Sequence, residues 1–258
     1  MPIKGHWAAK YLMGLWLMSE GGDLQFYDLS GNQNTGTIAG NITWQPGKFG
    51  PCLDFAATTA CPTIPHKSWL DFNGYTGSYT FIMSVKGASQ AASYRLIEKL
   101  GGAGAYPIGI MGSAAGQPLA YIYDGTNNPG VSLGTVIDGN WHIIAFVVDN
   151  AADYLYGYND GLLVGSTLNT VTAGTANTAP YYLGNRYLYD RDFIGQIGFI
   201  MAYNRALSTA EIARLYREPF CMFERTAIEL WGRPTEEAPP AGLSIPVAMR
   251  YYRNRRAA

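Results

Sequence analysis

Short apolar runs alternate with turn residues along most of the chain, and this pattern predicts strands. The runs are rich in Val, Ile, Thr, Tyr and Phe, and turn sequences such as Asp124-Gly125 separate them. We assign strands to residues 79–85, 108–111, 119–123, 141–148, 154–158 and 194–203, and a buried first strand to 11–18. Many short strands without helical periodicity between them predict an antiparallel sandwich or barrel.

One segment near the end of this pattern has the signature of a helix. Ser208 and Glu211 have the spacing of a capping box, in which each side chain bonds the backbone N–H of the other residue. Ile212 and Leu215 then share one helical face, and Pro219 stops the helix. The sequence therefore predicts a short helix over 208–218.

Two strands carry an unusual distribution of apolar residues. Residues 141–148 are apolar on both alternating faces, so something has to cover the second face: the helix at 208–218, the C-terminal extension or a neighbouring subunit. Tyr154, Tyr156 and Tyr158 form an aromatic stripe with a period of two. This stripe is either part of the core or an exposed binding or subunit face.

The composition changes after the helix, where prolines interrupt the chain and the last sixteen residues carry four arginines and no acid. We predict a domain over 1–218 and an extension over 219–258 that is too short for its own core. The extension is interpreted as a docking tail for a partner, through Ile245, Val247, Met249, Arg250, Tyr251, Tyr252 and Arg253. A solvated tail is the alternative, and nucleic-acid binding is disfavoured because the rest of the chain is net acidic.

Charge and cysteine content narrow the class of protein further. Only 14% of the 258 residues are charged and the net charge is −1, which favours association and excludes a disordered acidic protein, a coiled coil and a collagen. The three cysteines form no disulfide framework and no zinc motif. Cys52 and Cys61 are either bonded across a hairpin or two small core residues.

The N-terminal segment resembles a signal peptide only superficially. Lys4 and Lys10 precede the apolar run 11–18, but no small-x-small cleavage site follows it. The run is also far too short for a membrane span. We therefore expect a protein that folds in a cytoplasm.

An ordered set of short motifs resembles one known family of domains. The motifs lie at residues 28–36, 44–50, 53–55, 78–81, 138–142, 159–161, 182–184, 194–197 and 203–208. In this order they are similar to a concanavalin A-like, laminin-G-like domain, and the resemblance covers roughly residues 12 to 218. It implies an all-β, two-sheet antiparallel jelly-roll sandwich with one concave sheet, here followed by one short C-terminal helix and an extended tail. Such domains mainly bind glycans or proteins.

A loop early in the chain is a candidate calcium site. Asp28, Ser30, Asn32 and Asn34 place oxygen-bearing side chains at alternate positions of a tight loop. The resemblance implies a further ligand from an Asp late in the fold, where this chain has Gly198. An Asx-turn that bonds its own backbone is the alternative.

A second loop is the candidate for ligand recognition. It contributes Asn185, Arg186, Tyr187, Tyr189, Asp190 and Asp192. Tyrosines stack on sugar faces, while Arg, Asn and Asp hydrogen-bond hydroxyl groups. The alternative is an ordinary solvated hairpin.

Catalytic motifs are missing from the sequence, so we predict a protein that is not an enzyme. The E-x-D-x-x-E arrangement of related glucanases does not occur, and Asp190 and Asp192 flank Arg191 in a loop with no reason for a raised pKa. Gly130-Val-Ser-Leu-Gly134 fits a nucleophile elbow, but a turn follows it instead of a helix. No P-loop, HExxH or dinucleotide motif is present.

Two functional hypotheses follow. The first is a bacteriophage virion subunit (capsid decoration, head fibre or tail-associated), made in the host cytoplasm and anchored by its tail. Its partners would be other virion subunits or itself, and host-surface glycans. The alternative is a free lectin-like carbohydrate-binding module, with a glycoside hydrolase as a remote third.

Overall fold

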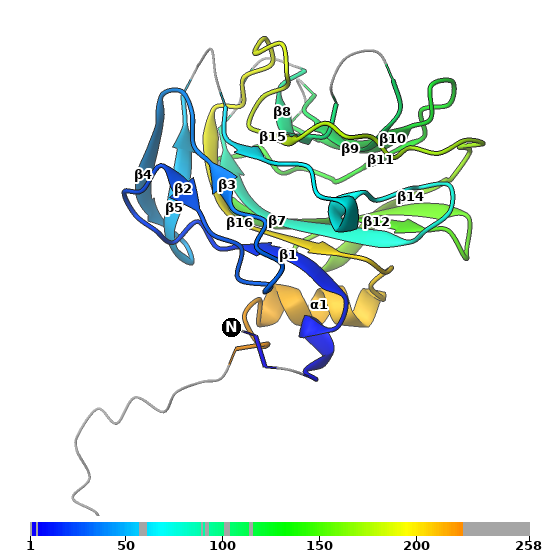
Figure 1. Ribbon diagram of the computed structural model, residues 1–258, viewed down its shortest axis with the longest axis horizontal. Helices are drawn as coiled ribbons and strands as arrows, with labels where there is room; N and C mark the ends of the chain where they lie inside the picture. Colours follow the sequence, from blue (N-terminus) through cyan, green and yellow to red (C-terminus); the bar gives the residue numbers. More distant parts are fainter. Residues whose placement is uncertain are drawn as a thin grey trace, which may run out of the picture. The chain divides into compact units, whose positions relative to one another are not determined.

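A computed structural model describes residues 2–3, 5–56, 61–88, 90, 93–100, 104–113 and 116–223. The chain divides into two compact units, Met1–Glu224 and Arg225–Ala258, and all elements below belong to the first. That unit is the two-sheet antiparallel sandwich that the sequence predicts, with one short α-helix (Figure 1). The first unit includes Phe220, Met222 and Phe223, which lie beyond the boundary expected after residue 218.

Each sheet has eight strands. In sheet 1 the order is β14 (Leu162–Leu168), β13 (Tyr154–Asn159), β12 (Trp141–Asp149), β7 (Tyr79–Gly87), β16 (Gly195–Tyr203), β5 (Gly50–Phe55) and β4 (Ile42–Gly47), and β1 (Leu12–Trp16) also pairs with β16. In sheet 2 the order is β11 (Gly130–Ser132), β10 (Leu119–Tyr123), β9 (Tyr106–Met111), β8 (Arg95–Glu98), β15 (Tyr181–Leu183), β6 (Thr63–Ile64), β3 (Gly36–Thr37) and β2 (Gln25–Phe26). Two short 3₁₀ helices, η1 (Trp7–Ala9) and η2 (Ser68–Leu70), precede β1 and β7.

The main core lies between the two sheets. Phe81 of β7 and Phe146 of β12 face Ile97, Ile110 and Leu183 of sheet 2, and all five are almost completely buried. Alternation along each strand sends every second side chain to this interface. The opposite face of each sheet is therefore the one available for a covering element or for solvent.

The chain itself covers the second face of sheet 1. Ile143 and Val147 of β12 belong to a second apolar cluster that includes Ile212 and Leu215 of α1 (Thr209–Arg217). Figure 1 shows α1 against this outer surface of sheet 1. Of the three coverings that the sequence left open, the helix is confirmed, and the first residues of the extension, among them Met222 and Phe223, contribute to the same cluster.

The tyrosine stripe on β13 grades from buried to exposed. Tyr158 is buried beneath the helix, and its hydroxyl lies 3.0 Å from Thr209 Oγ1. Tyr154, at the other end, is 38% exposed and stacks on Tyr156. The core interpretation is therefore confirmed at Tyr158, and at Tyr154 the stripe is exposed, where a binding or subunit face stays a prediction.

The predicted capping box is present at α1. Ser208 Oγ accepts the N–H of Glu211, and the Glu211 carboxylate accepts the N–H of Ser208. Arg205 adds two hydrogen bonds of 2.7 and 2.9 Å to the same carboxylate. The hydrogen bonds from Arg205, with those from Ser208, lower the pKa of Glu211 from 4.5 to about 2.

The lowered pKa of Glu211 predicts a pH-dependent stability. A carboxyl group with a lower pKa in the folded state stabilises the fold above its unfolded pKa, and the contribution disappears as the pH falls through the folded value. We expect the free energy of unfolding to decrease between pH 4.5 and about 2. In Glu211→Gln, urea denaturation should show a shallower decrease over this range; an unchanged slope would contradict the assignment.

Both buried cysteines are free. Cys52 lies in β5 of sheet 1, whereas Cys61 lies just before β6 of sheet 2. A bond across a hairpin is therefore wrong, and the alternative of two small core residues is confirmed. Burial raises the pKa of Cys52 to about 11 and that of Cys61 to about 12.

The N-terminal apolar run forms β1, in which Leu15 and Trp16 are buried as a first strand requires. Among the described residues, no helix combines the length and the apolar character needed to cross a membrane.

Candidate binding face

The outer face of sheet 2 carries a row of polar and aromatic residues, and no helix of the described chain covers it (Figure 1). Directly paired residues of neighbouring strands point to the same face of a sheet. The row reads Gln25, Thr37, Thr63, Tyr182, Glu98, Gly109, Tyr121 and Gly130 from β2 to β11. Its neighbours along the strands, among them Ile97, Ile110 and Leu183, point into the core.

Four tyrosines of this surface, Tyr106, Tyr121, Tyr123 and Tyr182, are called the tyrosine face below. The ring centroid of Tyr106 lies 5.5 Å from that of Tyr121 and 5.3 Å from that of Tyr123. Tyr121 is almost fully buried, whereas Tyr106, Tyr123 and Tyr182 are partly exposed. The rings of Tyr106, Tyr121 and Tyr123 therefore pack against one another, and the surface they form with Tyr182 is partly open to solvent.

A buried ion pair lies beneath these rings. Glu98 Oε1 accepts Nε of Arg95 at 2.7 Å and the hydroxyl of Tyr121 at 3.2 Å. Glu98 is 1% exposed and Arg95 7%. Glu98 Oε2 is buried and has no hydrogen-bond partner among the described residues. Buried polar atoms are usually satisfied, so this oxygen is an acceptor that a water molecule or a ligand hydroxyl would complete.

Gly109 makes the contact between Tyr121 and Glu98 geometrically feasible. It lies between these two residues in the row, and the Tyr121 ring lies over it. A Cβ atom at this position would be 2.6 Å from Cζ of Tyr121, so any side chain would displace the ring. The absence of a side chain at Gly109 therefore lets the phenol reach the carboxylate.

The hydroxyl groups of Tyr106, Tyr121 and Tyr182 are protonated at neutral pH. Burial raises the pKa of Tyr106 to about 12 and moves the pKa of Tyr121 upward as well. Burial, followed by the effect of nearby Tyr189, raises the pKa of Tyr182. Each hydroxyl can therefore donate a hydrogen bond, as Tyr121 already does to Glu98.

The loop over 185–192 joins this surface, but two of its predicted ligand residues serve another purpose. Asn185 is buried; its Nδ2 donates to Asp192 Oδ1 at 2.6 Å, and its Oδ1 accepts the N–H groups of Arg186 and Arg191. Asn185 and Asp192 therefore hold the loop in shape. The carbonyl of Arg191 accepts the N–H of Arg95, which ties the loop to β8 beside the tyrosine face.

The remaining predicted residues stay at the surface of the loop. Nε and Nη2 of Arg186 donate hydrogen bonds of 2.5 and 2.6 Å to the two carboxylate oxygens of Asp190. This ion pair raises the pKa of Arg186 and lowers that of Asp190. Tyr189 is 41% exposed at the tip, and Tyr187 is partly buried. The loop thus adds two tyrosines and a paired, rather than a free, arginine to the surface.

At Asp28 the structure shows the Asx-turn that the sequence left as the alternative to a calcium site. Asp28 Oδ1 accepts hydrogen bonds from the backbone N–H groups of Leu15 and Ser30. Asp28 Oδ2 accepts hydrogen bonds from the hydroxyl of Ser30 and from the backbone N–H and the side-chain amide of Asn34. The side-chain amides of Asn32 and Asn34 donate to the carbonyl of Met13. These N–H and O–H donors surround the carboxylate and fasten the loop to β1, whereas calcium binding at this loop stays a prediction. Within the described part of the chain, no cluster of three or more His, Cys, Asp or Glu could hold a metal ion.

The proposed docking residues of the extension fall outside the described residues. These are Ile245, Val247, Met249, Arg250, Tyr251, Tyr252 and Arg253.

Reasoning from the sequence did not find the residues at the centre of the face. Tyr121 and Tyr123 alternate with Ile122 and could have been recognised as an outward stripe. Arg95 and Glu98 flank two apolar residues in a strand that is buried throughout, so no alternation marked them.

The comparisons with known proteins agree with this architecture. The model of a family described as the concanavalin A-like lectin/glucanases superfamily matches residues 59–213. No curated protein sequence matches the chain.

Solved structures with the same fold include bacterial binding domains. The binding domain of Paraclostridial Mosquitocidal Protein 1 is 16% identical, with a TM-score of 0.68 over 81% of this chain and 52% of that one. Domain 4 of AbnA, a GH43 extracellular arabinanase from Geobacillus stearothermophilus in complex with arabinotriose, is 21% identical, with a TM-score of 0.59 over 80% of this chain and 98% of that one.

The binding domain of botulinum neurotoxin DC, in complex with rat synaptotagmin II, is 12% identical, with a TM-score of 0.65 over 81% of this chain and 52% of that one. The chain thus spans about half the length of the toxin binding domains that it matches. At these identities the likeness concerns the fold.

Proposed function

Because the chain belongs to the concanavalin A-like lectin/glucanase superfamily, we propose that it is a non-catalytic binding module whose tyrosine face recognises a carbohydrate. The observation that carries this proposal is a set of partly exposed tyrosines above a buried Arg95–Glu98 pair. Aromatic rings stack on the apolar faces of sugars, and phenolic hydroxyls form hydrogen bonds with sugar hydroxyls. The arabinotriose complex of the AbnA domain supports a sugar ligand, and the complex of the botulinum neurotoxin DC binding domain with rat synaptotagmin II supports a protein ligand as the alternative.

The proposal of a non-catalytic role rests on how the acids near the face are engaged. Glu98 bonds Arg95 and Tyr121, Asp190 bonds Arg186, and Asp192 bonds Asn185. A glycosidase needs two carboxyl groups that flank the scissile bond, one of them protonated. Each of these three acids is committed to a structural partner instead.

Substitutions of single tyrosines test the proposal. We expect Tyr182→Ala and Tyr123→Ala to weaken binding of the full chain to its best ligand on a glycan array by about tenfold each, because each removes a stacking ring worth about 1.4 kcal/mol. Tyr154→Ala is the control, since Tyr154 is a solvent-exposed tyrosine on sheet 1, away from the tyrosine face. Equal losses in all three variants, or binding to no glycan, would contradict the proposal.

A role as a subunit of an assembled particle, such as a phage virion formed in a host cytoplasm, is a second candidate. One observation favours it: the edge strand β14 exposes Leu162, Leu163, Val164 and Leu168, and it contains no charged residue or proline that would discourage pairing. Light scattering after size exclusion tests this role. An oligomer that Leu162→Lys and Leu168→Lys dissociate supports it, and a monomeric full chain at high concentration contradicts it.

A further inference from the structure

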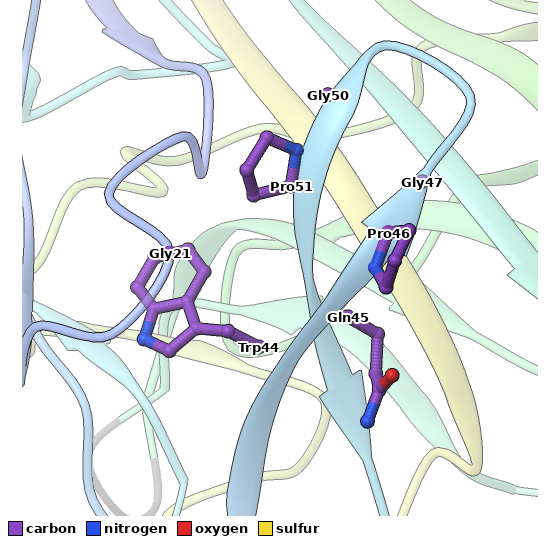
Figure 2. A pocket seen from close by; sticks show the side chains of 7 residues that line it. All are labelled: Gly21, Trp44, Gln45, Pro46, Gly47, Gly50 and Pro51. Atoms are coloured by element: carbon purple, nitrogen blue, oxygen red, sulfur yellow. The ribbon is translucent and has the colours of Figure 1, made fainter.

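A second concave site lies on sheet 1, at the hairpin formed by β4 and β5, and no residue of the tyrosine face lines it. This Trp44 pocket has a volume of about 440 Å³ and is lined by Trp44, Gln45, Pro46, Pro51 and three glycines, among them Gly21. Pockets that bind small molecules usually measure about 300–1,000 Å³. Figure 2 shows the Trp44 indole beside Pro51, with the segment that carries Gly21 running past the indole.

The Trp44 ring is held at its edge. Its Nε1 donates to the carbonyl of Asp23 at 3.0 Å, and the ring packs in part against the main core. Because the edge is bonded and the side chain is only partly buried, a ring face stays available to a ligand. An aromatic ring that is already fixed loses little conformational entropy when a ligand stacks on it.

The wall of the pocket opposite Trp44 comes from the segment that contains Gly21, a residue in the left-handed conformation. Gly21 has φ +71°, and a Cβ atom placed there would lie 3.9 Å from Cγ of Pro51. The segment over 20–23 therefore approaches the hairpin closely from one side. Tyr27 fixes the shape of this segment by donating its backbone N–H to Glu20 and its hydroxyl to Asp23. The pocket is thus bounded by two parts of the chain rather than by one hairpin.

The lining determines which ligand chemistry fits. None of the seven lining residues is ionisable, so the pocket offers no partner to a charged ligand. The indole and the two proline rings supply apolar walls, and the backbone at the glycines supplies polar groups. A sugar ring combines apolar and polar groups in a similar way, since it has an apolar face and hydroxyl groups around its rim.

We propose that the Trp44 pocket binds the ring of a neutral saccharide, as a subsite separate from the tyrosine face. The inference rests on the proposed function, because it assigns to the chain a second contact with the same class of ligand. Two contacts on one chain raise the apparent affinity for a polymer over that for a short oligosaccharide.

The experiment follows the indole N–H resonances of the ¹⁵N-labelled full chain, which has six tryptophans. Trp44→Phe identifies the Trp44 resonance by its loss. Arabinotriose, xylotriose, cellotriose and mannotriose are then titrated separately into the wild type, Tyr182→Ala and Pro51→Ala. We expect at least one trisaccharide to shift the Trp44 resonance saturably, equally in the wild type and Tyr182→Ala, and with severalfold weaker affinity in Pro51→Ala, which lacks one apolar wall of the pocket.

The outcomes separate this inference from the proposed function. A Trp44 resonance that no trisaccharide moves, or that only a proline-rich peptide moves, overturns the inference. If a sugar binds and Tyr182→Ala weakens that binding while the Trp44 resonance stays fixed, the tyrosine face stands and the pocket proposal fails. Pro51 is exposed, so its substitution keeps the test valid if Trp44→Phe does not fold.

Discussion

Replacing Glu98 by alanine is expected to lower the free energy of unfolding by roughly 3–5 kcal/mol, because removing one partner of a buried ion pair leaves the other charge uncompensated. Among the described residues, Arg95 keeps the backbone carbonyls of Ser93 and Tyr94 as acceptors, and the hydroxyl of Tyr121 loses its acceptor. Urea denaturation followed by circular dichroism measures the loss. The effect should be among the largest of any polar substitution in the described chain, since Glu98 is 1% exposed.

Glu98→Gln is the matched control for this prediction. Glutamine keeps an oxygen that accepts from Arg95 and Tyr121 but removes the negative charge, so its loss should be smaller than that of the alanine variant. If Glu98→Ala unfolds at the same urea concentration as the wild type, the buried pair does not support the face. In that case the rings of the tyrosine face would have to be held by their mutual packing alone.

Leu215→Ala is expected to cost about 2–5 kcal/mol, the usual range for removing a buried leucine side chain. Leu215 is 1% exposed on α1, where it belongs to the cluster that covers the outer face of sheet 1. The cost arises from lost apolar contacts and from the cavity left against β12. Thermal or urea denaturation of the full chain measures it.

Arg217→Ala on the exposed side of the same helix is the control, and its effect should stay within about 0.5 kcal/mol. Equal effects of the two substitutions would mean that α1 is not packed on the sheet. The second face of β12 would then need another cover, such as the neighbouring subunit that its two-sided apolar pattern also allowed.

The fold could be predicted well where local patterns determine it. The strand assigned to 119–123 matches β10, and the two-sided apolar pattern of 141–148 correctly required a covering element. The capping box located α1 to within a residue at either end. Strands such as β3 and β6 have two residues each, too few for any alternation, and were therefore missed.

The centre of the candidate site could not be predicted, because pairing between distant segments creates it. Glu98 meets Tyr121 only through the register of β8, β9 and β10, with Gly109 between them. At Asp28 the composition correctly indicated oxygen atoms but gave no information on where they point. The carboxylate accepts hydrogen bonds from the N–H groups of Leu15 and Asn34. Which donors reach the carboxylate depends on how β1 packs beside the loop.

The most direct test of the central claim is hydrogen–deuterium exchange of the full chain with and without the oligosaccharide that it binds best. The account predicts that the ligand slows exchange in peptides covering β9, β10 and the segment from β15 through residue 192, with little change in β13 and β14. Protection confined to β13 and β14, with β9 and β10 unaffected, would contradict recognition through the tyrosine face.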